Sequence, residues 1–120
     1  MMRIESDAIG SLPIYEEAYY GIHSYRAKEN FSLSKQKVDW SLIQQVAQIK
    51  AAAAIANQRS GTLSKEKAAV IVTAAEEIMM GKWQDEFIVD TFQGGAGTST
   101  NMNVNEVIAN RGLELLGHKK

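Results

Sequence analysis

The sequence predicts a mainly α protein in which an irregular segment, residues 1–37, precedes a helical part, residues 38–120. In the helical part, apolar side chains recur every three or four positions over long runs, which is typical of helices with one buried face. Residues that favour helix N-termini precede these runs, and glycines follow them. The 120 residues include one proline, so little in the chain interrupts a helix.

Residues 1–37 contain no sustained helical or alternating pattern. The sequence Gly10-Ser11-Leu12-Pro13 predicts a turn, and Ala18-Tyr19-Tyr20-Gly21 predicts a compact aromatic element. We therefore expect this segment to be irregular.

Asp39 is a plausible N-cap for a helix over residues 40–58. Four consecutive alanines, residues 51–54, favour helix formation and allow neighbours to approach closely on more than one side. We expect a buried or nearly buried helix. Its predicted apolar stripe consists of Leu42, Val46, Ile49, Ala53 and Ala56.

Two more helices are expected. Ser64 can cap the next one, which Gly81 ends, and the last begins near Thr100 with Gly117 as its C-cap. Their apolar positions are Ala68, Ile71, Val72, Ala75, Ile78 and Met79 in the first, and Val104, Val107, Ile108 and Leu115 in the second.

A glycine-rich turn directly before the last helix is the most informative feature for function. Gly94, Gly95 and Gly97 let the backbone turn tightly and approach a ligand. The first N–H groups of the following helix and the positive end of its dipole favour an anion there. Neutral donors suited to a carboxylate follow, namely Thr98, Ser99, Thr100 and Asn101. The alternative is a simple turn with an N-cap.

The turn does not match the nucleotide-binding motifs. A Walker A loop needs Lys and then Ser or Thr after its last glycine, whereas Thr98 and Ser99 follow Gly97. The dinucleotide fingerprint fails because its third glycine falls on Thr100. The preceding residues 87–92 form only a short strand-like run.

Composition excludes several other classes. A hydrophobic fraction of 45% and a formal net charge of −1 predict one soluble globular domain, or a piece of a larger one, without a footprint for nucleic acid. The sequence has no membrane-spanning run and starts too polar for a signal peptide, so we expect a cytoplasmic protein. With no cysteine, and with only His23 and His118 far apart, a metal site is not expected.

The acidic residues do not form an obvious catalytic set. By default they are expected on solvated helix faces, at Glu76, Glu77, Asp85, Glu86 and Glu106. The wide apolar arcs of the helices and the missing catalytic set together suggest a fragment of a larger protein.

Several separated motifs resemble one enzyme superfamily in order and content. They are residues 3–10, 18–23, 26–31 and 93–110, which together extend over nearly the whole chain. They closely resemble the N-terminal domain of the aspartate ammonia-lyases, within the aspartase and class II fumarase superfamily. Fumarases more often carry Ser and Gln at the places of Ala96 and Ser99, so fumarase is the second choice.

The resemblance implies reversible conversion of L-aspartate to fumarate and ammonia by a homotetramer without an organic cofactor. Each active site of the family is built from three subunits, and this chain would supply one wall. A base removes a proton from the β-carbon, and the adjacent carboxylate gains enediolate character. Donors that strengthen as this charge develops suit the task.

The resemblance also assigns residues. Thr98 matches the substrate-binding threonine of the family, and the backbone around Gly97 and Ser99 is expected to bind with it. Asn101 could bind substrate or cap the helix. His23 and Arg26 match the family pattern, but structural roles are at least as plausible as substrate contact.

The catalytic serine loop and the second histidine segment of the family have no counterpart in residues 1–120. We therefore expect no catalytic residue within this chain and no lyase activity from it alone. A different class remains open: a non-catalytic helical interaction module whose glycine turn only caps a helix.

Overall fold

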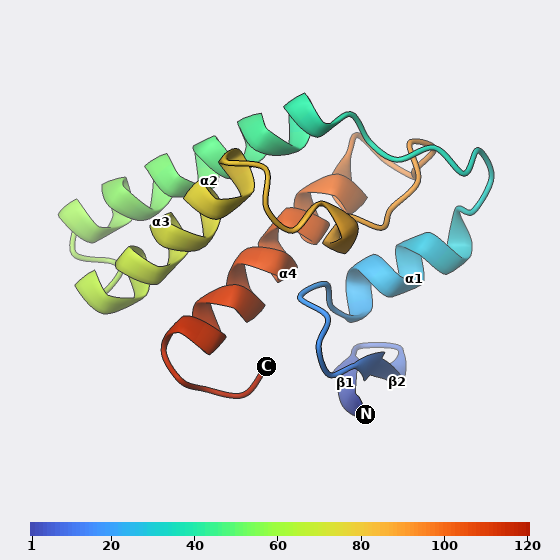
Figure 1. Cartoon of the computed structure of the whole chain (residues 1–120), viewed down its shortest axis with the longest axis horizontal. Helices are drawn as coiled ribbons and strands as arrows, with labels where there is room; N and C mark the ends of the chain where they lie inside the picture. The colour runs from blue at the N-terminus through green and yellow to red at the C-terminus, as the bar shows by residue number, and fades with distance from the viewer.

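The computed structural model describes all 120 residues and confirms a mainly α fold. A small two-stranded sheet lies at the N-terminal end, and four helices make up most of the rest (Figure 1). The strands are β1 (Met2–Asp7) and β2 (Gly10–Tyr15), and the helices are α1 (Ile22–Asn30), α2 (Trp40–Arg59), α3 (Lys65–Met79) and α4 (Thr98–Leu115). A 3-10 turn, η1 (Gln84–Glu86), follows α3.

The segment expected to be irregular, residues 1–37, contains a β-hairpin and a helix. β1 and β2 pair antiparallel from Met2 with Tyr15 to Asp7 with Gly10. The predicted turn at residues 10–13 is wrong, because those residues belong to β2 and the chain reverses just before them. The reversal is stabilised by the Asp7 carboxylate, which accepts a hydrogen bond from the Ile9 N–H at 3.0 Å.

Arg3 holds the hairpin against the segment that leads to α1. Its guanidinium donates to backbone carbonyl oxygens at and beyond the end of β2, those of Tyr15, Glu16, Ala18 and Tyr20. In the same segment Tyr19 is buried, and its ring meets that of Trp83 edge to face, with centroids 4.8 Å apart. The predicted aromatic element is therefore part of the core.

The caps predicted for the two middle helices are confirmed. The Asp39 carboxylate accepts from the Ser41 N–H at 2.8 Å, and the Ser64 hydroxyl accepts from the Lys67 N–H at 3.2 Å. α2 and α3 then pack side by side as a helical hairpin, and α4 lies between this pair and α1 (Figure 1). The core forms where α2, α3 and α4 meet, and includes Ile43, Ala47, Ala75, Ile78, Val104 and Val107.

The apolar stripe predicted for α2 is wrong in phase. Leu42 and Ile49 are 50% and 65% exposed, whereas Ile43, Ala47 and Ala54 are buried. α2 packs mainly against α3 and α4, with Trp40 also on Phe87, so a helix with apolar residues over a wide arc leaves part of that arc open. α2 is therefore not a nearly buried helix within these 120 residues.

The predicted end of α4 agrees with the structure, because Gly117, with a φ of +79°, follows the last helical turn. Its predicted start near Thr100 is two residues late, since α4 begins at Thr98. The strand-like run at residues 87–92 forms only an isolated bridge between Lys37 and Asp90.

Candidate functional site

The glycine turn leads directly into α4. Gly97 is the N-cap of the helix, with a φ of +84°, and Gly95 has a φ of +75°. Both values lie in the left-handed region that residues with a Cβ rarely adopt. No side chain caps the helix at Gly97, and a Cβ placed there would meet nothing within 4 Å. The turn therefore leaves the first turn of α4 uncovered.

Gln93 closes one part of this helix end. Its amide oxygen accepts from the Thr100 N–H at 3.0 Å, and its amide nitrogen donates to the Thr100 hydroxyl at 2.7 Å. The same nitrogen donates to the Asp90 carbonyl at 3.0 Å. Thr100 is buried, so the expectation that its hydroxyl is a free donor is wrong. Nothing in the local sequence pattern signalled this role for Gln93.

The remaining donors at the start of α4 are open. The N–H groups of Thr98 and Ser99 have no partner within the protein, and neither hydroxyl makes a hydrogen bond. Thr98 is exposed and Ser99 is half-buried. The Asn101 side chain does not cap the helix, so the capping alternative for this residue is wrong.

Asp90 anchors the segment that carries the turn. Its carboxylate accepts from the Ser34 and Lys35 N–H groups, both at 3.0 Å, and from the Phe92 N–H at 2.8 Å. The Ser34 hydroxyl adds a fourth bond at 2.5 Å. This hydroxyl, and then the N–H donors, hold the pKa of Asp90 below its usual range despite burial.

Phe31 supports the glycine turn from the side. A Cβ placed on Gly94 would lie 3.2 Å from Phe31 Cζ, so a larger residue would press against the ring. Sequence reasoning missed Phe31 and Ser34, because both lie about 60 residues before the turn, and it missed Asp90, because the partners of its carboxylate include Ser34 and Lys35 in that distant segment. Together they position the open end of α4 without blocking it.

Arg26 and His23 lie on α1 and have structural partners. Arg26 Nε donates to Asp7 Oδ2 at 2.7 Å, which ties the helix to the hairpin and lowers the pKa of Asp7. The His23 N–H donates to Glu106 Oε2 at 3.2 Å, while its ring is exposed and makes no hydrogen bond. The structural alternative is confirmed for Arg26.

Three of the carboxylates expected on solvated faces are not solvated. Glu77 accepts from Arg111 Nε and from the Trp83 ring N–H, both at 2.8 Å. Glu86 accepts from the Tyr19 N–H at 2.7 Å, and Glu106 accepts from the N-terminal N–H groups of α1. Their partners lie far away in sequence, which is why charge pattern alone misplaced them. Asp85 and Glu76 are exposed, as expected.

The Glu77 pair is the strongest ionic contact near the core. The hydrogen bond from Arg111 lowers the pKa of Glu77, and the same bond raises the pKa of Arg111. Next to it, burial, followed by the hydrogen bond to Glu114, raises the pKa of Tyr19 to about 12. These groups tie the C-terminal half of α4 to α3 and to the segment that contains Tyr19.

No group of three or more histidine or acidic side chains lies close enough to hold a metal ion. No helix has the length and hydropathy needed to cross a bilayer. The groups available at the turn are two backbone N–H groups, two hydroxyls and the positive end of a helix dipole, none of them a charged side chain. Such a set can hold a carboxylate in a fixed orientation.

Comparison with known proteins places the chain in a family. A model of a lyase family matches residues 10–120. An aspartate ammonia-lyase of a Bacillus species is 51% identical over 119 residues, which cover 99% of this chain and 25% of the relative. The aspartate ammonia-lyase of Escherichia coli K12 is 47% identical over 122 residues, which cover 99% of this chain and 26% of that relative.

Solved structures agree with this placement. The fumarate lyase:delta crystallin protein of Brucella melitensis superimposes with a TM-score of 0.97 at 49% identity, covering 99% of this chain and 28% of that one. The class II fumarase of Schistosoma mansoni superimposes with a TM-score of 0.95 at 33% identity. The match covers 100% of this chain and 26% of that one.

The chain spans about a quarter of the length of the curated relatives it matches. Within that span the likeness extends over both the hairpin and the helices, because 99% of the chain is aligned. The family model, the sequence relatives and the folds all point the same way, and the chain belongs to this lyase family.

Proposed function

We propose that this chain is part of an aspartate ammonia-lyase, which converts L-aspartate reversibly to fumarate and ammonia, and that it supplies one wall of the substrate carboxylate site. The observation that carries the proposal is the open start of α4, where Thr98 and Ser99 offer unpaired N–H and hydroxyl donors. Relatives named aspartate ammonia-lyase, about half identical over the chain, support the choice of reaction.

The substrate-binding residues in this proposal are Thr98, Ser99, the backbone at Gly97, and Asn101, whose side chain has no partner within the chain. Removal of a β-proton places charge on the neighbouring carboxylate, so donors held at a helix N-terminus bind the transition state better than the substrate. The donors are already in position before substrate arrives, because Gln93, Asp90 and Phe31 fix the turn.

The remaining parts of the proposal come from the family. The whole enzyme works as a homotetramer in the cytoplasm without a cofactor, and it does not act on nucleic acid or in a membrane. The residues that move protons lie outside residues 1–120, so this chain alone has no lyase activity. It acts as a binding wall that other parts of the assembly complete.

The test is a Thr98→Ala variant of the natural full-length protein, assayed by fumarate absorbance with L-aspartate. We expect kcat/KM to fall by the equivalent of roughly 2 to 4 kcal/mol, as for the loss of an oxyanion-hole donor, with the melting temperature almost unchanged. The matched control is Thr73→Ala, since the exposed Thr73 hydroxyl bonds only to the Ala69 carbonyl of its own helix. Unchanged turnover in Thr98→Ala would refute the carboxylate site.

A class II fumarase is the second candidate, because a fumarase of Schistosoma mansoni shares the fold at 33% identity. The same assay separates the two reactions, since a fumarase forms fumarate from L-malate and not from L-aspartate. Activity with neither substrate in the natural protein would instead favour the non-catalytic helical module, in which Thr98→Ala should change stability little because the Thr98 hydroxyl makes no hydrogen bond within the chain.

A further inference from the structure

We propose that the cleft between the loop at residues 31–37 and the segment at residues 88–90 is a second anion-binding site, separate from the start of α4. Its ligand class is a small phosphate-bearing anion, held by the ammonium groups of Lys28, Lys35 and Lys37. The proposal does not depend on the reaction proposed above.

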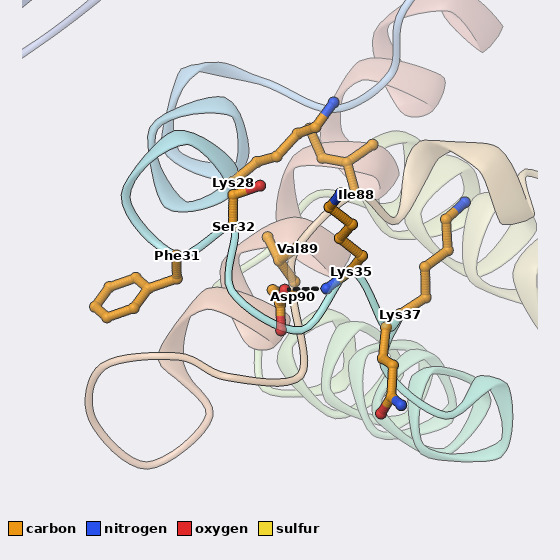
Figure 2. Close-up of a pocket in the computed structure, with 9 residues that line it drawn as sticks. Lys28, Phe31, Ser32, Lys35, Lys37, Ile88, Val89 and Asp90 are labelled. Atoms are coloured by element: carbon orange, nitrogen blue, oxygen red, sulfur yellow. Dashed lines mark hydrogen bonds between the residues drawn. The ribbon is translucent and has the colours of Figure 1, made fainter.

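The cleft has a volume of about 220 Å³. In Figure 2, Lys28 lies on one side and Lys37 on the other, with Lys35 between them beside Ile88. The remaining lining consists of Phe31, Ser32, Gln36, Val89 and Asp90. Three of the chain's 13 basic residues thus meet in one hollow of a molecule whose formal net charge is −1.

The positive charge of this cleft is only partly offset by the protein, because three ammonium groups face one ionised carboxylate. Asp90 is the only acidic residue in the lining, and its carboxylate already accepts four hydrogen bonds from Ser34, Lys35 and Phe92. All four come from N–H or hydroxyl donors and none from an ammonium group. Asp90 therefore shapes the loop and leaves the lysine side chains without an acidic partner in the cleft.

The neighbouring acidic residues do not compensate either. Lys28 and Lys35 form no ion pair, and Lys37 Nζ lies 4.0 Å from Asp85 Oδ1 in a pair whose carboxylate is fully exposed. A pair of that kind is weak in water. Glu29, next to Lys28 in sequence, lines a different hollow with Arg26 and the hairpin.

The backbone at Lys35 adds an independent observation. Its φ is +58°, in the left-handed region that residues with a Cβ rarely adopt. Asp90 holds it there through the Lys35 N–H, as the dashed line in Figure 2 marks. Residues kept in such conformations cluster at ligand sites, and Lys35 is one of the residues that line the cleft.

The kind of side chain points to the kind of anion. Lysine binds phosphate as a compact point charge with rotatable donors, and three such groups match an anion that carries more than one negative charge, as a phosphoryl group does near neutral pH. Gln36 and Ser32 add a neutral amide and a hydroxyl. The volume lies below the roughly 300 to 1,000 Å³ of drug-sized pockets, which suits one or two phosphoryl groups with little attached.

The experiment is calorimetric titration of the natural full-length protein with pyrophosphate, inorganic phosphate and succinate as separate probes. We expect binding of pyrophosphate, and more weakly of phosphate, that decreases as salt concentration rises. Succinate is expected to bind less tightly than pyrophosphate in the cleft. Succinate binding that depends on the three lysines, without lysine-dependent pyrophosphate binding, would overturn the phosphate assignment.

Variants locate the probe. Lys28→Gln/Lys35→Gln/Lys37→Gln is expected to weaken pyrophosphate binding by at least about tenfold. The matched control removes three exposed lysines elsewhere, Lys65→Gln/Lys67→Gln/Lys82→Gln, and should leave the affinity unchanged. An equal loss in both triple variants would mean a general charge effect and would overturn the site.

Two single variants make the test independent of folding. Lys35→Gly removes one ammonium group and relieves the left-handed strain, so it should fold at least as well and still bind pyrophosphate more weakly. Thr98→Ala should leave pyrophosphate affinity unchanged. Loss of binding in Thr98→Ala, or none in Lys35→Gly and the cleft triple variant, would place the probe elsewhere and refute the proposal.

Discussion

The first turns of α1 and α4 both contain backbone N–H groups that have no partner within their own helix, but these groups are paired in α1 and largely unpaired in α4. In α1, the Ile22 N–H donates to Glu5 at 2.8 Å, and the next two N–H groups donate to Glu106. In α4, Gln93 takes only the third N–H group, and those of Thr98 and Ser99 stay free. One helix end is closed by the protein's own carboxylates, and the other is left open for a carboxylate from outside.

The difference depends on which residues can come near. Gly21 gives the space at α1, because a Cβ there would lie 2.0 Å from Glu106 Oε2 and 2.9 Å from Glu5 Oε2. At α4 the residue before the helix is also glycine, but nothing lies within 4 Å of its missing Cβ. The same residue type thus admits an internal anion at one end and leaves room for a ligand at the other.

The largest effect is expected from placing a charge at the open end. Gly97→Asp in the full-length protein puts a carboxylate beside the free N–H groups, where it competes with and repels the substrate carboxylate. We expect kcat/KM for L-aspartate to fall by roughly a thousandfold, equivalent to about 4 kcal/mol. Gly97→Asn is the control, since it has the same shape, tolerates a left-handed φ and carries no charge. Equal losses in both variants would show that shape, not charge, matters.

The next largest effect is expected from crowding the closed end. Gly21→Ala pushes the Glu106 and Glu5 carboxylates away from the start of α1 and leaves N–H groups unpaired. We expect a loss of about 3 kcal/mol of unfolding free energy by chemical denaturation. Gly112→Ala is the control, because a Cβ there makes ordinary contact with Val70 at 3.4 Å and favours the helix. If Gly21→Ala costs no more than the control, the closed end is not tightly packed.

A smaller effect is expected from removing the partial closure of α4. Gln93→Ala leaves the buried N–H and hydroxyl of Thr100 without partners, so we expect about 2 kcal/mol of destabilisation. Gln48→Ala, on the exposed side of α2, should change stability by less than about 0.5 kcal/mol. Equal melting temperatures for the two variants would contradict the role given to Gln93.

The smallest effect is expected from the ionisation of the Glu106 carboxyl group at the start of α1. Burial raises the pKa of Glu106, so its contribution to stability is fully present below the ordinary glutamate pKa and is lost as pH rises through the raised value. Glu106→Gln does not titrate and keeps one oxygen acceptor, so we expect a change below about 1 kcal/mol that turns in favour of the variant as pH rises. Denaturation at pH 4 to 8 checks this, with exposed Glu76→Gln as control. A pH-independent difference would contradict it.

The helical part was predictable because its signals are local. Asp39 and Ser64 cap the helices they precede, since a side-chain oxygen can reach the N–H groups two or three residues on without help from the rest of the fold. The hairpin was missed because it depends on contacts between residues far apart in sequence. Among them are the hydrogen bonds from the Arg3 guanidinium to four backbone carbonyl oxygens. The phase of α2 was missed because its apolar arc is wider than the face that α3 and α4 cover.

For the candidate site, the glycine turn and the residues Thr98 and Ser99 were predictable from the sequence, as was the resemblance to the lyase family. The sequence did not reveal that Gln93 hydrogen-bonds to Thr100 and so makes its hydroxyl unavailable to a ligand. The two side chains come together only when the glycine turn has formed.

The sequence by itself determined where helices begin, that a glycine turn precedes the last one, and to which family the chain belongs, since each depends on residue order over short stretches. Only the tertiary structure decided which helix end is closed and which is open, and which lysines line one cleft. Those outcomes depend on carboxylates tens of residues away in sequence, such as Glu106 at α1 and Asp90 at the 31–37 loop. A local sequence pattern cannot indicate which distant residues will come into contact.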